Sequence, residues 1–294
     1  MLGEVLTAIV TPFNADGSVN VEKFRELAIH LVDNGSDGIV VAGTTGESPT
    51  LSDDEKLELF AAAVDAVGSR ATVIAGTGTY DTRHSAHMTE RADPLGVDGF
   101  LVVTPYYNKP PQRAIVRHFE EIAARTDKPI VAYNIPSRVV INIEPQTIAR
   151  LAEIDNVTAV KQAHGDIDEA RFIAEETPLE LYSGDDPVTL AFLEVGGVGV
   201  VSVTAHVWGT QIKELIRRFR AGDADGARQL HEELQPSYDL LKVQTNPIAI
   251  KAALNLLGHE VGGHRLPMVE PSEHEVDEIR GCLERSGVLT GASA

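Results

Sequence analysis

Eight short apolar segments recur along the chain about every 20 to 35 residues. They are rich in Val, Ile and Ala, and most are apolar throughout instead of alternating with polar residues. This pattern is typical of strands that are buried on both faces of a parallel sheet. The predicted strands are Leu6–Val10, Gly38–Ala42, Thr72–Ala75, Gly99–Val103, Pro129–Tyr133, Val157–Lys161, Glu180–Tyr182 and Val198–Val203.

The segments between these strands have the spacing of amphipathic helices. Val21–Asp33 and Asp53–Val67 place apolar residues three and four positions apart, and Ser52 with Glu55 predicts a capping box at the second helix. Strand and helix alternate eight times, which predicts an α/β fold of the (β/α)8 TIM-barrel class. A doubly wound open sheet would usually have a glycine-rich loop after its first strand, where this chain has Thr11-Pro12-Phe13.

After the eighth strand the pattern is helical only. Four helices are predicted, over Thr210–Arg220, Asp225–Leu241, Asn246–Leu257 and Ser272–Ser286. The first of them completes the barrel. We therefore expect a barrel over residues 1–222, which carries the active site, and a C-terminal extension of three helices over 223–294 that packs on it.

Composition narrows the range of partners and locations. The chain has 294 residues, 43% of them apolar, and a net charge of −19, which repels nucleic acid and anionic membranes. Its single cysteine, Cys282, cannot form an intrachain disulfide. No signal-peptide pattern and no apolar run of about 18 residues is found, so we expect a cytoplasmic protein without a membrane partner.

The candidate catalytic residues stand at the carboxyl ends of the strands, where barrel enzymes carry their chemistry. Lys161 ends an otherwise apolar strand, and burial there favours the neutral amine that attacks a ketone to form a Schiff base. A lysine that leaves the barrel at its rim and pairs with a carboxylate is equally compatible with this position. Tyr133 ends the neighbouring strand, either as a core residue or as a proton shuttle that Thr44 and Tyr107 assist.

Two other kinds of site have little support in the sequence. The segment from Gly43 to Glu47 lacks the Gly-Lys-Ser/Thr ending of a phosphate-binding P-loop. The ten histidines show no metal-binding spacing such as His-x-x-x-His. We therefore expect neither a metal nor another cofactor.

Several motifs together resemble the dihydrodipicolinate synthase family. They are Gly43-Thr44-Thr45-Gly46-Glu47, Thr104-Pro105-Tyr106-Tyr107, Tyr133-Asn134-Ile135-Pro136-Ser137-Arg138 and the Lys161 strand, within a likeness that runs from Leu6 to about Leu289. The resemblance implies 4-hydroxy-tetrahydrodipicolinate synthase activity, in lysine biosynthesis through diaminopimelate. In it, Lys161 forms an imine with pyruvate, and the enamine attacks L-aspartate-4-semialdehyde before the product cyclises.

The resemblance also implies roles for further residues. Tyr133 shuttles protons with Thr44 and with Tyr107, which reaches in from a neighbouring subunit, so that a dimer is the minimal active unit and a homotetramer the usual assembly. Thr45 holds the pyruvate carboxylate, and the main chain near Gly184 and Val201 lines the pocket. Arg138 forks onto the carboxylate of the semialdehyde, unless it is a surface ion pair.

Two alternative functions stay open. N-acetylneuraminate lyases and 2-keto-3-deoxy sugar acid aldolases share the imine lysine, although other residues replace Arg138 in them. A catalytically silent barrel that binds oxo acids is the second alternative.

The chain departs from the commonest family pattern after the imine lysine. Lys161-Gln162-Ala163-His164 stands where Lys-Glu-Ala-Thr is frequent. We expect Gln162 to point away from the barrel interior and to be neutral for catalysis. His164 is expected to be a solvated loop residue, with a contact to substrate as the alternative.

The resemblance also bears on regulation by L-lysine. Family members that lysine inhibits bind it near Ser48, Tyr80, His84 and Tyr106, and His84 replaces a carboxylate that often grips the lysine amine. Lys56 adds positive charge beside that cleft, which repels a cationic effector. The sequence therefore predicts weak or absent inhibition by lysine.

Overall fold

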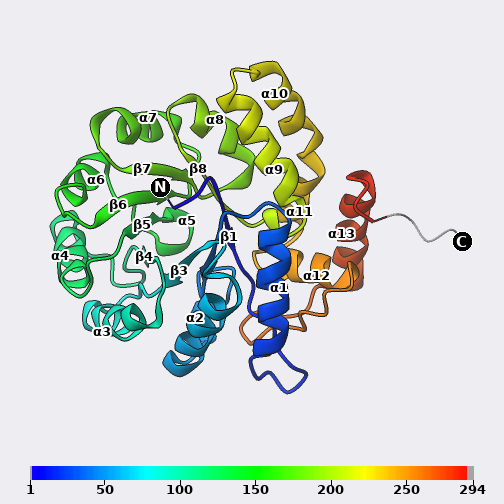
Figure 1. Ribbon diagram of the computed structural model, residues 1–294, viewed down its shortest axis with the longest axis horizontal. Helices are drawn as coiled ribbons and strands as arrows, with labels where there is room; N and C mark the ends of the chain where they lie inside the picture. The colour runs from blue at the N-terminus through cyan, green and yellow to red at the C-terminus, as the bar shows by residue number, and fades with distance from the viewer. Residues whose placement is uncertain (1, 290–294) are drawn as a thin grey trace, which may run out of the picture.

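The computed structural model describes residues 2–289, and its centre is a closed barrel of eight parallel strands (Figure 1). Each strand pairs with its neighbours in sequence, and β8 pairs with β1 to close the barrel. The (β/α)8 fold predicted from the apolar segments is therefore confirmed. The strands are β1 (Val5–Ala8), β2 (Gly38–Val41), β3 (Thr72–Gly76), β4 (Gly99–Val103), β5 (Ile130–Asn134), β6 (Val157–Gln162), β7 (Glu180–Ser183) and β8 (Gly199–Ser202).

The strand side chains form two separate apolar layers, because successive residues of a strand point to opposite faces. On β5, Val131 and Tyr133 belong to the cluster inside the barrel. Ile130 and Ala132 belong to the larger cluster between the strands and the surrounding helices. The interior of the barrel is thus filled with side chains, and a site can open only at one of its ends.

Helices surround the barrel in the order that the sequence pattern predicts. The predicted helices Val21–Asp33 and Asp53–Val67 are α1 and α2 of the structure, and the capping box of Ser52 and Glu55 is present. The other helices that belong to the barrel are α3 (Thr82–Ala92), α4 (Gln112–Ala123), α5 (Pro136–Val139), α6 (Pro145–Leu151), α7 (Ile167–Glu176), α8 (Thr189–Glu194) and α9 (Ala205–Arg220), with short 3-10 turns η1 (Ser48–Thr50), η2 (Asp93–Leu95) and η3 (Asp186–Val188).

The C-terminal part of the chain differs from the prediction in one helix. It forms α10 (Ala224–Glu233), α11 (Gln235–Val243), α12 (Ile248–Leu256) and α13 (Glu273–Arg285), which Figure 1 shows together on the side of the barrel beside α1 and α9. The structure has four helices where the pattern predicts three, because the helix expected over Asp225–Leu241 is broken at Leu234. Pro236, which has no backbone N–H, stands in the first turn of α11 and explains the break. The boundary near Gly222 stays a prediction, and residues 290–294 of the expected extension lie outside the described residues.

Across residues 2–289, none of the helices combines the length and the apolar character that crossing a membrane requires.

Two buried histidines give the fold a dependence on pH. His206 joins the ends of the first and last strands, since its Nε2 accepts the Val10 N–H at 3.1 Å and its Nδ1 lies 2.8 Å from the Val203 carbonyl oxygen. Burial lowers the pKa of His206 to about 4, and burial likewise lowers the pKa of His118 to about 4. Both rings are therefore neutral in the folded protein near pH 7.

We expect the free energy of unfolding to fall as the pH drops from about 6.5 to about 4. In this window the unfolded chain binds protons at these histidines and the folded protein does not. Replacing His118 by leucine should reduce the loss of stability across the window by about 3 kcal/mol. Urea unfolding at a series of pH values measures it. His274→Leu, at an exposed position of α13, should keep the wild-type pH dependence, and an equal dependence in His118→Leu would contradict the assignment.

Candidate active site

Lys161 points into the barrel near the carboxyl end of β6. Ala159, two positions earlier, belongs to the interior cluster, and strand alternation places Lys161 on the same face. Only 5% of Lys161 is exposed, and its Nζ lies 4.2 Å from the centroid of the Tyr133 ring. The two residues are also direct partners in the β5–β6 register. Among the described residues no carboxylate lies within ion-pair distance of this amine, which disfavours the alternative of a rim lysine with an acidic partner.

Gly184 lies against the Lys161 side chain, and Val201 lies in the same barrel interior. A Cβ atom on Gly184 would lie 3.0 Å from Lys161 Cε and 2.7 Å from Ala163 Cβ. Those distances are too short for undisturbed packing, so the absence of a side chain at Gly184 makes room for the lysine. Val201 on β8 is 1% exposed and belongs to the interior cluster that contains Tyr133.

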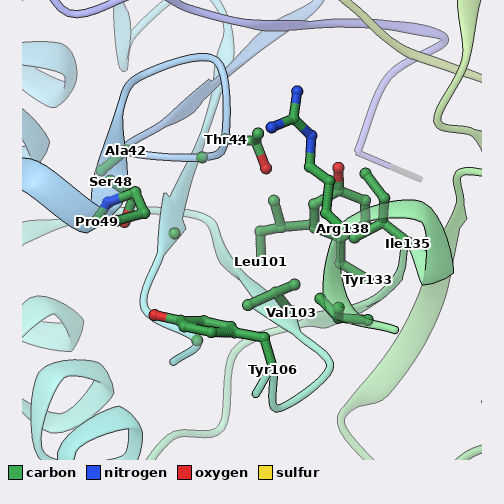
Figure 2. Close-up of a pocket in the computed structure, with 14 residues that line it drawn as sticks. Ala42, Thr44, Ser48, Pro49, Leu101, Val103, Tyr106, Tyr133, Ile135 and Arg138 are labelled. Carbon is green, nitrogen blue, oxygen red and sulfur yellow. The ribbon is translucent and has the colours of Figure 1, made fainter. Parts of the chain in front are cut away.

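A cavity opens at the carboxyl ends of the strands. Thr44, Tyr133 and Arg138 line it together with Ser48 and Tyr106. Figure 2 shows the side chains of Thr44 and Arg138 near that of Tyr133, with Tyr106 farther away. The structure therefore brings together three residues that the sequence nominates from two separate motifs.

Thr45 and Arg138 are connected by a residue of the C-terminal extension. The Thr45 hydroxyl, which is buried, accepts a hydrogen bond from Asn246 Nδ2 at 2.9 Å. The Arg138 guanidinium donates to the Asn246 carbonyl at 3.0 Å and to the Thr245 hydroxyl at 3.4 Å. Arg138 thus bonds to neutral oxygens of the extension and not to a surface carboxylate.

Asn246 is the site residue that the sequence did not reveal. It stands 201 positions from Thr45 and 108 positions from Arg138, and no motif marks it. Its Oδ1 is buried and has no hydrogen-bond partner among the described residues. The only local signal is that it precedes Pro247 at the start of α12.

Tyr107 does not reach the cavity of its own chain. It is 89% exposed and has a left-handed backbone, with φ of 69°. Its neighbour Tyr106 lines the cavity instead and contacts the edge of Tyr80, with ring centroids 5.3 Å apart. Burial raises the pKa of the Tyr106 hydroxyl, and Tyr80 adds to the effect. Placement of Tyr107 in a partner's site stays a prediction.

Comparison with known proteins agrees with this geometry. The dihydrodipicolinate synthetase family matches residues 1–286. The 4-hydroxy-tetrahydrodipicolinate synthase of Moorella thermoacetica is 50% identical over 289 residues, which are 98% of this chain and 99% of that protein.

Solved structures give the same result. A dihydrodipicolinate synthase from Cyanidioschyzon merolae with lysine bound aligns with a TM-score of 0.96, at 42% identity, over 98% of this chain and 99% of that one. A chloride-inhibited dihydrodipicolinate synthase from Acinetobacter baumannii, complexed with pyruvate, aligns with a TM-score of 0.95 at 33% identity, over 98% and 100%. The chain belongs to the dihydrodipicolinate synthetase family. The resemblance stated from its motifs is confirmed.

The residues that follow Lys161 lie partly as predicted. Gln162 is fully buried and points away from the barrel interior, where its Oε1 accepts a hydrogen bond from Asn134 Nδ2 at 2.9 Å. The prediction for His164 is wrong. Its side chain is only 19% exposed, and its Nε2 lies 3.0 Å from Glu169 Oε2, so it is neither a solvated residue nor part of the described cavity.

The residues around the predicted lysine-binding cleft are already paired with one another. His84 Nε2 lies 2.9 Å and 3.0 Å from the two carboxylate oxygens of Asp53. Lys56 is buried, and burial lowers the pKa of its amine although Asp53 acts in the opposite direction. The Asp53 carboxylate therefore already interacts with His84 and Lys56 of its own chain in the absence of an effector.

In the part of the chain that the structure describes, no group of three or more His, Cys, Asp or Glu side chains is arranged to hold a metal ion.

A buried ion pair supports the loop that carries Thr44 and Thr45. Lys251 of α12 and Glu47 are 0% and 2% exposed, with 3.0 Å between Nζ and Oε1. Lys251 also donates to the carbonyl oxygens of Thr11 and Gly263. Burial lowers the pKa of Lys251, and Glu47 opposes this shift. Through this ion pair the C-terminal extension stabilises Glu47, which ends the loop that carries Thr44 and Thr45.

Removing only one member of this pair should be costly. We expect Lys251→Met to lower the free energy of unfolding by about 3 to 5 kcal/mol, because it leaves the Glu47 carboxylate buried without its partner. Glu47→Gln combined with Lys251→Met should recover part of that loss, since no buried charge then remains. Lys242→Met, which removes an exposed ion pair with Asp239, should cost at most about 1 kcal/mol. Urea unfolding compares the variants, and a double variant no more stable than Lys251→Met would count against the pair.

Proposed function

We propose that this protein is a 4-hydroxy-tetrahydrodipicolinate synthase, which condenses pyruvate with L-aspartate-4-semialdehyde in lysine biosynthesis through diaminopimelate. The observation that carries the proposal is the buried Lys161 amine against the ring of Tyr133, which lines one cavity with Thr44 and Arg138, in a member of the dihydrodipicolinate synthetase family. A relative with this name is 50% identical over almost the whole chain.

The chemistry begins at Lys161. Its neutral amine attacks the keto carbon of pyruvate, and loss of water leaves an imine, which is protonated at nitrogen as it reacts. Loss of a proton from the methyl group then gives an enamine, whose carbon attacks the aldehyde carbon of the semialdehyde. The amino group of the semialdehyde portion finally displaces Lys161 from the imine carbon, which closes the ring and returns the free lysine.

Tyr133 is the proposed proton shuttle in these steps. Its ring already contacts the Lys161 amine at 4.2 Å. A phenol exchanges protons near neutral pH only with help from hydrogen-bonded neighbours, and Thr44 of the same cavity supplies one of them. We propose that Tyr107 of a second subunit supplies the other. Its 89% exposure in one chain supports this assignment.

Two carboxylates are bound separately in this proposal. The hydroxyl and backbone N–H of Thr45 hold the pyruvate carboxylate, and the main chain at Gly184 and Val201 encloses the reacting carbon. Arg138 binds the carboxylate of the semialdehyde through its planar guanidinium. The bond from Arg138 to the Asn246 carbonyl pre-orients that guanidinium.

The proposal includes the assembly and location. We propose a homotetramer built from dimers in which Tyr107 is exchanged, acting in the cytoplasm without a cofactor. The lone cysteine, Cys282, is buried and unpaired, which suits a reducing compartment.

The alternative functions are not favoured, because the relatives reported above carry the synthase name. Turnover decides between them. Purified protein given pyruvate should consume L-aspartate-4-semialdehyde and leave N-acetylneuraminate and 2-keto-3-deoxy sugar acids intact. Turnover of a sugar acid alone would contradict the proposal, and absence of all turnover would favour a silent oxo-acid-binding barrel.

Arg138→Ala is expected to impair use of the semialdehyde selectively. The loss of a charge-assisted contact should reduce kcat/KM for the semialdehyde on the order of 10- to 100-fold. The KM for pyruvate should change little, because Arg138 does not touch the Thr45 loop directly. Steady-state kinetics with each substrate varied measures both values. Equal loss for the two substrates would contradict the role of Arg138.

Gly184→Ala is expected to hinder imine formation. The new Cβ would displace Lys161 Cε or Ala163, and a lysine forced from its preferred rotamer should react with pyruvate about tenfold more slowly. Rapid-quench reduction with borohydride gives the rate. Gly165→Ala is the matched control, because its Cβ would meet only Val188 Cγ1 at 3.9 Å. Similar rates for the two variants would refute the packing argument.

L-Lysine at sub-millimolar concentration is expected to leave the condensation rate unchanged or nearly so. The Asp53 carboxylate is engaged by His84, and Lys56 near Asp53 adds positive charge that repels a cationic effector. A condensation assay with increasing lysine tests this, because a weak site stays largely empty below about 1 mM lysine. Strong inhibition in that range would refute the prediction.

A further inference from the structure

The residues directly after Tyr133 and Lys161 share one polar network behind the barrel. Asn134 follows Tyr133 and Gln162 follows Lys161, so strand alternation points both side chains away from the interior. Asn134 Nδ2 donates to Gln162 Oε1 at 2.9 Å, and both residues are fully buried. Asn134 and Gln162 are therefore each adjacent in sequence to a residue of the proposed reaction, Tyr133 or Lys161.

The carboxylate of Glu169, on the first turn of α7, is the centre of this network. It accepts hydrogen bonds from Asn142 Nδ2 at 3.0 and 3.1 Å and from Gln162 Nε2 at 3.2 Å. His164 Nε2 lies 3.0 Å from Glu169 Oε2. One carboxylate thus collects donors from the loop after α5, from the end of β6 and from the loop that follows β6.

The protons of the network can be assigned from its partners. The backbone N–H of Asp166 donates to His164 Nδ1 at 3.3 Å, so the neutral ring carries its proton on Nε2 and donates it to Glu169. Gln162 Nε2 donates to the same carboxylate oxygen at 3.2 Å and lies 2.6 Å from the ring nitrogen. An acceptor at position 169 serves both His164 Nε2 and Gln162 Nε2.

The network also holds the segment that carries Arg138. Asn134 Nδ2 donates to Asn142 Oδ1 at 2.6 Å, and the Ile143 N–H donates to Asn134 Oδ1 at 3.0 Å. These bonds attach the chain that follows α5, the short helix of Arg138, to the end of β5. A change at Glu169 is therefore transmitted to β5, to β6 and to this loop together.

We propose that Glu169 is a positioning residue for the condensation: through Gln162, His164 and Asn142 it fixes Lys161 against Tyr133 and holds the Arg138 segment over the cavity. This inference rests on the proposed function. The network does not touch the Thr44–Thr45 loop. A variant of Glu169 should therefore affect use of the semialdehyde more than binding of pyruvate.

The proposal gives Glu169→Gln a specific kinetic signature. The amide places an NH2 group among donors that need an acceptor, so kcat should fall about tenfold, and the KM for the semialdehyde should rise several-fold. The KM for pyruvate should stay within about twofold, because its carboxylate site is on another loop. Glu175→Gln, at an exposed position of the same helix, is the matched control and should behave as wild type.

A swap of carboxylate and amide then separates positioning from stability. In Gln162→Glu with Glu169→Gln, the new carboxylate at 162 accepts from Asn134 and His164, and the amide at 169 donates to it and accepts from Asn142. The double variant should therefore recover kcat to within about threefold of wild type. Gln162→Glu alone, with two adjacent carboxylates, should be impaired.

The outcomes are distinct from those that test the proposed function. Wild-type protein that fails to condense the two substrates refutes the function itself. Active wild-type protein with an unchanged kcat in Glu169→Gln, whether or not the melting temperature falls, overturns the positioning role. So does a rise in the KM for pyruvate equal to that for the semialdehyde, or a double variant as slow as Glu169→Gln.

Discussion

The packing of the Lys161 amine against the Tyr133 ring is the contact on which the account depends. A closed parallel barrel fills its interior with side chains, so an amine inside it is tolerated only near an end where a cavity opens. The β5–β6 register places Lys161 and Tyr133 opposite one another, and Gly184 leaves the space that the lysine needs. The burial of the amine at this position is therefore a consequence of barrel closure and strand register more than of any loop.

Strand alternation places the side chains around this contact in two layers, one inside the barrel and one outside it. Lys161 and Tyr133 point inward, and the residues next to them, Gln162 and Asn134, point outward into the network centred on Glu169. The C-terminal extension supports the opposite side, where Asn246 bonds to Thr45 and Lys251 pairs with Glu47. The extension thus contributes contacts that support the candidate site. The sequence pattern alone predicts it only as helices that follow the barrel.

Local patterns were sufficient to predict the barrel and the candidate lysine. Apolar segments identified the strands, and the charged residue at the end of one of them made Lys161 a candidate, which the family motifs then favoured over a rim ion pair. The helix break at Leu234 was missed, although Pro236 is a readable signal. Asn246 could not be found in this way, because its partners lie more than a hundred positions away and depend on how α12 packs. His164 was misjudged because its partner Glu169 becomes visible only when the direction of α7 is known.

The most direct test of the central contact is chemical. The protein is incubated with pyruvate, reduced with borohydride and digested, and the peptides are examined by mass spectrometry. The account predicts that one lysine, Lys161, carries the reduced pyruvate adduct and that the adduct requires pyruvate to be present before reduction. An unmodified Lys161, or modification spread over exposed lysines in its place, would contradict it.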